Sequence, residues 1–206
     1  LPHILLYGSA GVGKTSLSRC ILAEAGYVVR QYTGGREMTE RFIKSMLLGM
    51  DISGYGKTGV RGPQGKITGL VLDEAHRIPC FEPFYSALED CQIDHEHGKV
   101  SWLPDFTAIF CTTVPNLLSK PLRDRLSLQI KLDDYSVREL SQIIRLNVEM
   151  TEGMAVEVAK RSRGVPRLAI AYARSVATFG GLSYFTQIGV TKEGLTPLDL
   201  AYLDAL

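Results

Sequence analysis

The chain has 206 residues, and its 23 lysines and arginines against 22 aspartates and glutamates give a formal net charge of +1. That length suits one large α/β domain, or one domain with a small appendage. An apolar fraction of 45% and a charged fraction of 22% are ordinary for globular proteins and exclude a disordered, collagen-like or acidic-tail chain. The near-neutral balance also argues against a surface that binds nucleic acid everywhere, so any such contact must come from local patches.

The sequence carries no sign of export or of membrane insertion. No apolar run approaches the roughly 20 residues that cross a bilayer, and nothing at Leu1 resembles the start of a signal peptide, so we expect a cytoplasmic protein. Each of the four cysteines lies in an apolar stretch, without a C-x-x-C pair; they are Cys20, Cys80, Cys91 and Cys111. This spacing favours buried free thiols over a disulfide framework or a zinc site.

Expected strands and helices alternate over the first 133 residues. We expect strands at 1–7, around 28–29, and at 67–72, 107–111 and 128–132, and helices at 15–26, 36–50 and 81–91. In the first of these helices, Leu17, Ile21 and Leu22 share one face. Residues 67–72 form a continuous apolar run, as in a strand that is buried on both faces of a parallel sheet. The alternation predicts a wound parallel α/β sheet.

From residue 136 onward the sequence indicates helices alone. Amphipathic segments at 137–149 and 154–162 are followed by a third at 166–178, after the break Gly164-Val165-Pro166. Thr196 and Pro197 start a further helix. We therefore expect an α/β domain over 1–133, a small all-α domain over 134–192 and the start of another domain over 193–206.

Two segments support a functional interpretation only weakly. Residues 53–69 hold six glycines and three cations, Lys57, Arg61 and Lys66, without an acid. A surface insertion explains this loop best, and a basic loop that contacts a phosphate backbone is the alternative. The run His95-Glu96-His97 is more typical of the exposed turn of a hairpin than of a metal site. We expect Trp102, on the returning strand, to be a core or edge anchor.

A phosphate-binding loop follows the first expected strand. Residues 8–15 (GSAGVGKT) match G-x-x-x-x-G-K-[ST] between a strand and a helix, the context in which that motif operates. The glycines let several backbone N–H groups approach one phosphate, the helix adds its positive N-terminal end, and Lys14 adds a charge near the β- and γ-phosphates. We expect ATP with Mg²⁺ as the ligand, bound by Gly8, Gly11, Val12, Gly13, Lys14, Thr15 and Ser16.

Acidic and hydroxyl side chains follow two later strands. Asp73 comes directly after the strand at 67–72, where it could hold Mg²⁺ together with the hydroxyl of Thr15. Glu74 could orient and polarise the attacking water. After the strand at 107–111, a hydroxyl of Thr112 or Thr113 could reach the γ-phosphate or that water. These residues indicate hydrolysis of the nucleotide.

Arginines at three places are candidates for phosphate contacts. Arg123 and Arg125 lie just before the last strand, where an arginine could act as a finger on a neighbour's nucleotide or belong to a surface salt-bridge patch. Arg167 begins a helix and could close over bound phosphates. Arg161 and Arg163 are expected to be solvated.

The whole chain resembles the AAA+ ATPases and, within them, the RuvB family of Holliday-junction branch-migration motors. Residues 4–15 are similar to the family's first strand and Walker A loop, and residues 70–77 (LVLDEAHR) to its Walker B stretch. Five further stretches resemble the approach to sensor 1 (85–93 and 103–113), the arginine-finger box (117–126), the sensor 2 helix (161–169) and the opening of a winged-helix domain (194–206).

The resemblance implies a P-loop fold with a helical lid, with Glu74 as the catalytic residue that orients the attacking water, Thr113 at sensor 1, Arg125 as the finger and Arg167 at sensor 2. It also implies a helicase that acts on branched or duplex DNA as a homo-oligomer, a hexameric ring, with RuvA as a partner. The chain departs from the family in that residues 53–69 look inserted and Val114 replaces a usual arginine. The hairpin between Cys91 and Leu103 is also shorter and more polar than the one that docks RuvA.

The expected function is therefore an ATP-hydrolysing DNA motor of the RuvB type. The alternative is an AAA+ switch that loads or remodels a protein on DNA, such as a clamp or helicase loader, without processive movement. A nucleotide-binding scaffold with weak hydrolysis is a third interpretation, and the intact Glu74 and Arg125 count against it.

Overall fold

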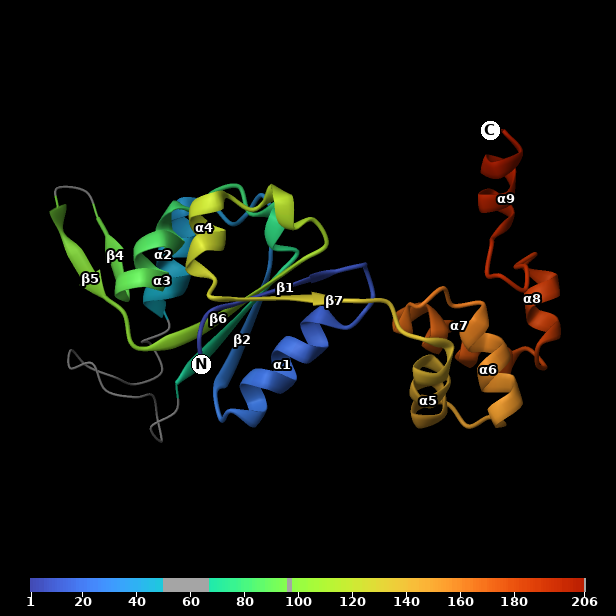
Figure 1. Ribbon diagram of the computed structural model, residues 1–206. Helices are drawn as coiled ribbons and strands as arrows, with labels where there is room; N and C mark the ends of the chain where they lie inside the picture. The colour runs from blue at the N-terminus through green and yellow to red at the C-terminus, as the bar shows by residue number, and fades with distance from the viewer. Residues whose placement is uncertain (50–66, 96–97, 206) are drawn as a thin grey trace. The chain divides into compact units, whose positions relative to one another are not determined.

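A parallel sheet forms the centre of the first part of the chain (Figure 1). The computed structural model describes residues 1–49, 67–95 and 98–205, and within them the strand order of this sheet is β2-β3-β6-β1-β7, with every pairing parallel. Its strands are β1 (Ile4–Gly8), β2 (Val28–Thr33), β3 (Thr68–Asp73), β6 (Phe106–Thr112) and β7 (Leu128–Leu132). The predicted wound parallel sheet is confirmed. A separate antiparallel hairpin joins β4 (Gln92–Asp94) and β5 (Val100–Trp102).

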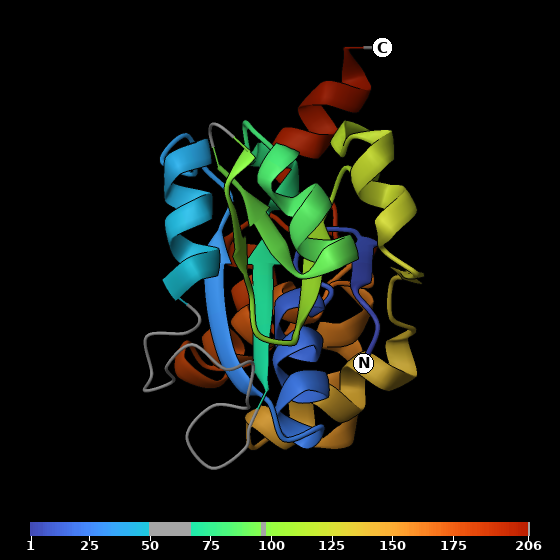
Figure 2. The ribbon, with the colours of Figure 1, turned by 90° about the vertical axis from the view of Figure 1, so that its left-hand side faces the viewer.

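Helices cover both faces of this sheet. They are α1 (Lys14–Glu24), α2 (Glu40–Leu48), α3 (Glu82–Asp90) and α4 (Lys120–Arg125). Leu5 of β1 and Phe110 of β6 pack with buried side chains of α2, α3 and α4, whereas Leu6 of β1 packs with Leu22 of α1. In Figure 1 the sheet accordingly runs between α1 below and α2, α3 and α4 above, and Figure 2 shows α2, α3 and α4 from the side. The alternation of side chains along each strand therefore builds two apolar layers.

Two of these helices differ from the sequence prediction. The buried residues of α1 are Lys14, Ser18 and Leu22, while Leu17 is exposed. The buried face is thus rotated from the predicted one, and Ser18 can lie inside it because its hydroxyl donates to the Lys14 carbonyl. α2 begins later than the predicted start at residue 36, because Thr39 takes the N-cap position and accepts a hydrogen bond from the Phe42 N–H (3.3 Å).

The expectation of burial was wrong for Trp102 and for Cys20. Trp102 is 75% exposed, because β5 belongs to the small hairpin and adds no strand to the main sheet. Cys20 is exposed, Cys80 and Cys91 are half-buried and Cys111 is buried. Cys20 lies two residues after Ser18, which places it on the opposite side of α1 from the buried row. All four cysteines are free thiols, as predicted.

A second unit consists of helices. It comprises residues Ser9–Gly13 and Asp133–Leu206, and its helices are α5 (Val137–Asn147), α6 (Glu152–Lys160), α7 (Pro166–Thr178), α8 (Ser183–Gln187) and α9 (Pro197–Asp204). Ile144, Val158, Val176 and Phe185 contribute to one apolar core from α5, α6, α7 and α8. α5 opens with a capping box, in which Ser136 and Glu139 exchange hydrogen bonds. The short helix α8 was not predicted.

Arg161 is part of this second core, contrary to the expectation that it is solvated. Its side chain is buried, its Nη1 donates to the carbonyl and to the carboxylate of Glu157 (2.7 and 2.8 Å), and its guanidinium lies 4.9 Å from the ring centroid of Phe185. The ion pair and the ring offset the burial of the charge. Arg163 is exposed, as expected.

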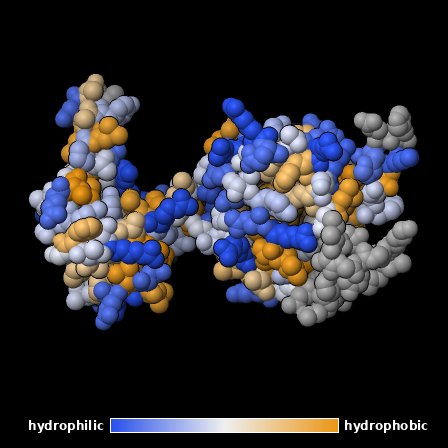
Figure 3. Space-filling model, turned by 180° about the vertical axis from the view of Figure 1, so that it is seen from behind, coloured by the Kyte–Doolittle hydropathy of each residue, from blue (hydrophilic) through white to orange (hydrophobic). Residues whose placement is uncertain are grey.

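The last helix, α9, exposes apolar side chains. Leu198 is 80% and Tyr202 is 67% exposed, and apolar residues of this helix appear in orange and tan at the upper left of Figure 3. α9 nevertheless has a defined start, since Thr196 and Asp199 form a capping box. Within the described residues, the protein contains no helix of the length and apolarity that a membrane span requires.

Candidate functional site

The ends of three strands bring the predicted site residues of the first unit to one edge of the sheet. Gly8 ends β1, Asp73 ends β3 and Thr112 ends β6. β6 pairs with both β1 and β3, so Thr112 lies between the start of the phosphate loop and the two acids. Ligands of open parallel sheets bind at this carboxyl edge.

The phosphate loop begins at a glycine that no other residue could replace without strain. Gly8 has a φ of +150°, and a Cβ at this position would collide with the carbonyl of Leu132 on the adjacent strand β7. Lys14, at the start of α1, is buried with 6% exposure, and its Nζ donates to the Gly8 carbonyl at 2.9 Å. The ammonium group is therefore held at the end of β1, beside the first residue of the loop.

The remaining loop residues contribute in different ways. Val12 is fully buried, so it can offer a ligand its backbone N–H group but not its side chain. Ser16 is exposed in the first turn of α1, where its N–H group belongs to the helix N-terminus that favours anions.

Thr15 and Asp73 meet at the position predicted for Mg²⁺. The Thr15 hydroxyl donates to Oδ2 of Asp73 at 2.7 Å, and Oδ1 of Asp73 accepts from the N–H of Glu74 at 3.0 Å. Hydroxyl and carboxylate oxygens are the hard donors that Mg²⁺ prefers, and this ion usually completes its shell with water and substrate phosphates. The pair fits such an ion, and the described residues contain no group of three or more acidic, histidine or cysteine side chains that could hold a metal without a substrate.

Glu74 belongs to a chain of polar contacts that reaches β6. Its Oε2 lies 3.5 Å from Nε2 of His76, and Nδ1 of His76 lies 2.9 Å from Oγ1 of Thr112. Oγ1 of Thr112 also accepts from the Val114 N–H at 3.0 Å. The tautomer of the His76 ring decides which of the two groups donates between Thr112 and His76. Glu74, His76 and Thr112 thus form one line of polar contacts from the end of β3 to the end of β6.

His76 is a residue that the sequence analysis did not single out as functional. In the sequence, the signal for His76 is its place two residues after Glu74. In the structure, it lies in a 3₁₀ turn (Ala75–Arg77) directly after β3. The predicted sensor residue, Thr113, follows β6 and is half-buried, whereas the hydrogen bond to His76 comes from its neighbour Thr112. The structure thus connects Glu74 to the end of β6 through Thr112.

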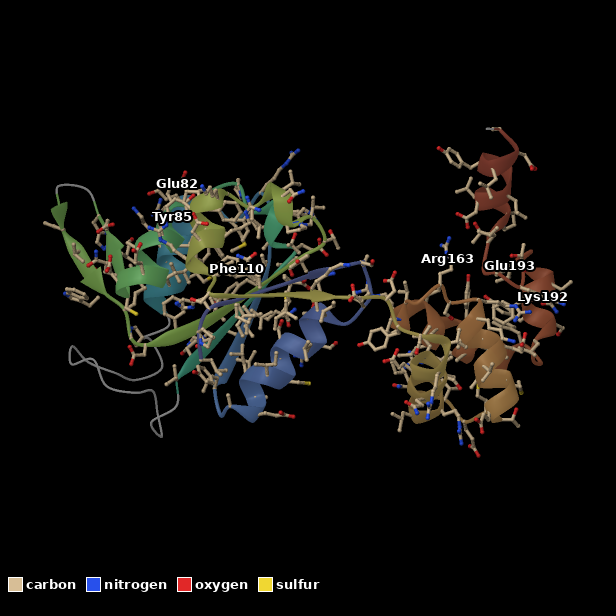
Figure 4. All side chains as sticks on the ribbon, viewed as in Figure 1. Glu82, Tyr85, Phe110, Arg163, Lys192 and Glu193 are labelled. Carbon is tan, nitrogen blue, oxygen red and sulfur yellow. The ribbon has the colours of Figure 1, made fainter. Side chains whose placement is uncertain are left out.

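Arg125 ends α4 and is held against α3. Its Nη2 lies 2.5 Å from Oε2 of Glu89, its Nε donates to the Tyr85 carbonyl at 3.1 Å, and its Nη1 donates to the Pro121 carbonyl at 2.9 Å. The guanidinium carbon also lies 5.2 Å from the centroid of the Tyr85 ring. Tyr85, labelled in Figure 4, comes from α3, close to α4. The side chain of Arg125 is still 28% exposed.

Arg167 lies beside one turn of the phosphate loop within the second unit. Its N–H donates to the Gly11 carbonyl at 3.4 Å. Gly11 has a φ of +84°, and a Cβ there would lie 2.8 Å from a methyl carbon of Val165 and 3.1 Å from Cβ of Arg167. The loop and the start of α7 therefore approach each other so closely that only glycine fits at this turn. The side chain of Arg167 is exposed.

Other residues that the sequence analysis considered lie outside the described residues. These are Lys57, Arg61 and Lys66 of the glycine-rich loop, and Glu96 and His97 of the hairpin turn.

Comparison with known proteins identifies the family of the first unit and of the whole chain. Residues 4–134 match the family described as "ATPase family associated with various cellular activities (AAA)". Among curated proteins, the Holliday junction branch migration complex subunit RuvB of Orientia tsutsugamushi (strain Boryong) is 34% identical over 98% of this chain and 66% of its own length. RuvB of Thermosipho melanesiensis is also 34% identical, over 97% of this chain and 67% of its own. The chain thus spans about two thirds of the length of these relatives.

Solved structures give the same result. The Thermotoga maritima RuvB Holliday junction branch migration motor is 30% identical, covers 100% of this chain and 68% of its own, and aligns with a TM-score of 0.79. A single-residue variant of the same protein aligns with a TM-score of 0.83, at 30% identity over 100% of this chain and 69% of its own. The chain belongs to the AAA family of ATPases and, within it, to the RuvB type.

Proposed function

We propose that this chain is an ATP-hydrolysing DNA motor that works as a homo-oligomeric ring, of hexameric size, on branched or duplex DNA. The observation that carries the proposal is the contact between Thr15 and Asp73, which joins the end of the phosphate loop to the acid-bearing end of β3. The relatives at 34% identity are RuvB subunits of Holliday junction branch migration complexes.

The phosphate loop and its two oxygen donors would bind the nucleotide. Lys14, which the Gly8 carbonyl holds at the end of β1, would exchange that partner for the β- and γ-phosphates. Thr15 and Asp73 would hold Mg²⁺, which neutralises charge on the phosphates when it is bound. The backbone N–H groups from Gly11 to Ser16 would cradle the phosphates at the start of α1.

Glu74 would orient the attacking water. Its side chain is 38% exposed and lies 3.5 Å from His76, so it is accessible to a water molecule at the edge of the sheet. His76 and Thr112 would hold the carboxylate in a fixed orientation relative to β6, and Thr113 would contact the γ-phosphate. A positioned carboxylate of this kind contributes about 10²–10⁴-fold to the rate of such a step.

Two arginines would stabilise the transition state or contact the nucleotide. Arg125 would reach the γ-phosphate bound by a neighbouring subunit and stabilise the charge that develops there. Arg167 would contact the nucleotide bound by its own subunit. When hydrolysis removes the γ-phosphate, this contact would change, and the helical unit that carries Arg167 would move. The exposed hairpin that carries Trp102 offers a surface for a RuvA-like partner protein.

The proposal is tested with a synthetic four-way DNA junction. We expect ATP turnover to rise when junction or duplex DNA is added, and we expect the protein to convert a mobile junction into duplex products in an ATP-dependent manner. The Glu74→Gln variant serves as the control that binds DNA and ATP without turnover. Turnover that ignores DNA but rises with a protein partner would contradict the motor and support a loader.

A further inference from the structure

The guanidinium group of Arg125 is fixed by its own subunit before any neighbour is present. Three of the five N–H groups that an arginine carries are engaged by Glu89, Tyr85 and Pro121. The guanidinium carbon also lies over the Tyr85 ring. Among the described contacts, two further N–H groups are left to meet a ligand.

Tyr85 links this arrangement to the other end of α4. Its hydroxyl lies 2.9 Å from Oγ of Ser119, and Ser119 is the N-cap residue of α4, since its Oγ accepts from the Leu122 N–H. The carbonyl and ring of the same tyrosine contact Arg125. One residue of α3 therefore contacts both the N-cap residue and the last residue of this short helix.

We propose that Glu89 and Tyr85 are positioning residues that preset Arg125 for a phosphate group on a neighbouring subunit. This inference rests on the proposed function, in which Arg125 acts in trans. A long arginine side chain loses conformational entropy when a ligand immobilises it. Contacts within the subunit that have already fixed its rotamers reduce that loss on binding.

Fold stability does not explain the Glu89 contact. Its side chain is 57% exposed and that of Arg125 is 28% exposed, and ion pairs at such exposed sites add little to folding stability. The removal of Glu89 should therefore leave the melting temperature almost unchanged. If the removal of Glu89 lowers ATP turnover but leaves the melting temperature unchanged, Glu89 positions Arg125 and does not stabilise the fold.

The test measures the contribution of Arg125 to a neighbour's ATP turnover by mixing two variant subunits. The acceptor is Arg125→Ala, which keeps Glu74 but lacks the finger, and the donor is Glu74→Gln, which keeps the finger but cannot hydrolyse ATP. ATP turnover in the mixture then reports only on the donor's Arg125. Donors with a second change, Glu89→Ala, Glu89→Gln or Tyr85→Ala, are compared with the unchanged donor.

We expect Glu89→Ala in the donor to lower the turnover of the mixture by about three- to tenfold, the range set by the immobilisation of one long side chain. Glu89→Gln, which keeps an oxygen acceptor at the same place, should restore part of the loss. Asp90→Ala is the matched control, because it removes an exposed acid from the next position of α3, and it should leave turnover unchanged. Tyr85→Ala should lower turnover at least as much as Glu89→Ala.

Two results would overturn the inference. Unchanged turnover with the Glu89→Ala donor would make the contact an ordinary surface ion pair, and increased turnover would mean that Glu89 competes with the neighbour's phosphate for Arg125. A donor with Glu74→Gln and Arg125→Ala together distinguishes these results from a failure of the proposed function. If that double variant supports as much turnover as the donor with an intact finger, Arg125 does not act in trans at all.

Discussion

At the scale of single residues, Glu74 has an unusual backbone. Its φ of 48° and ψ of 42° lie in the left-handed region, which for a residue with a side chain is disfavoured by about 1–3 kcal/mol. The strand β3 and the 3₁₀ turn that follows hold it there, between Asp73 and His76. Such strain is concentrated at functional sites, which agrees with a role for this carboxylate in the reaction.

The first prediction separates binding from hydrolysis. Lys14→Ala should lose measurable ATP binding, because the loop then lacks its full positive charge, whereas Glu74→Gln should bind ATP normally and turn it over at least about 100-fold more slowly. A fluorescent nucleotide titration measures the first quantity and steady-state phosphate release the second. Normal turnover in Glu74→Gln would remove this residue from the mechanism.

The second prediction concerns the thiols. Burial raises the pKa of the Cys111 thiol to about 11, and Cys20 is exposed on α1. Because the thiolate is the reactive form, a thiol reagent should modify Cys20 rapidly and Cys111 only when the protein unfolds. The Cys20→Ser variant should lose the fast phase of labelling. A fast phase that persists in this variant at Cys111 would contradict the packing of α1 on the sheet.

The sequence motifs predicted the loop and the two acids, but not the contact of His76 with Thr112. Each of these two motifs is a short continuous stretch of sequence, so it can be recognised from residue types and their spacing alone. The His76 contact depends on the register of β3 against β6, in which Leu72 pairs with Phe110. That register is set by packing between distant residues, and no local pattern contains it.

At the scale of elements, the length of a helix decided whether the sequence could predict it. α7 begins and ends at the predicted residues, 166 and 178, since it has thirteen residues of regular period and a proline at its start. α4 and α8 have six and five residues, which is less than two turns, so their apolar period cannot be recognised. The start of α4 is instead held by a tertiary contact, that of Ser119 with Tyr85.

The end of α6 gives a prediction for acid stability. Hydrogen bonds from Arg161 and Lys160 lower the pKa of Glu157 from 4.5 to about 2. A carboxyl group whose pKa is lowered by folding stabilises the protein above its unfolded pKa, and this contribution is lost as the pH falls toward the folded value. Wild type should therefore be more stable than Glu157→Gln above about pH 5, and the gap should narrow between pH 4.5 and 2.

Urea unfolding at a series of pH values, followed by circular dichroism, measures this gap. Glu152→Gln is a suitable control, because Glu152 is in the same helix and its contact with Arg145 is longer, at 3.7 Å. A gap between wild type and Glu157→Gln that stays constant down to pH 2 would show that the ion pair does not control the pKa of this residue.

At the scale of the whole molecule, the alternation of strands and helices predicted the class of fold but not the order β2-β3-β6-β1-β7. That order places β6 between the phosphate-loop strand and the acid-bearing strand, so it determines which hydroxyl contacts His76 beside Glu74. Local sequence patterns do not encode the neighbours of a strand in a parallel sheet, because these neighbours are joined by long crossovers.

The central claim is that one active site is assembled from two subunits, and mixed rings test it most directly. Arg125→Ala and Glu74→Gln should each bind ATP and show almost no turnover alone. When the two are combined in varied ratio, an intact Glu74 can face an intact Arg125, so we expect turnover to appear and to be highest near the equal mixture. Turnover that stays near zero at every ratio would contradict a site shared between neighbouring subunits.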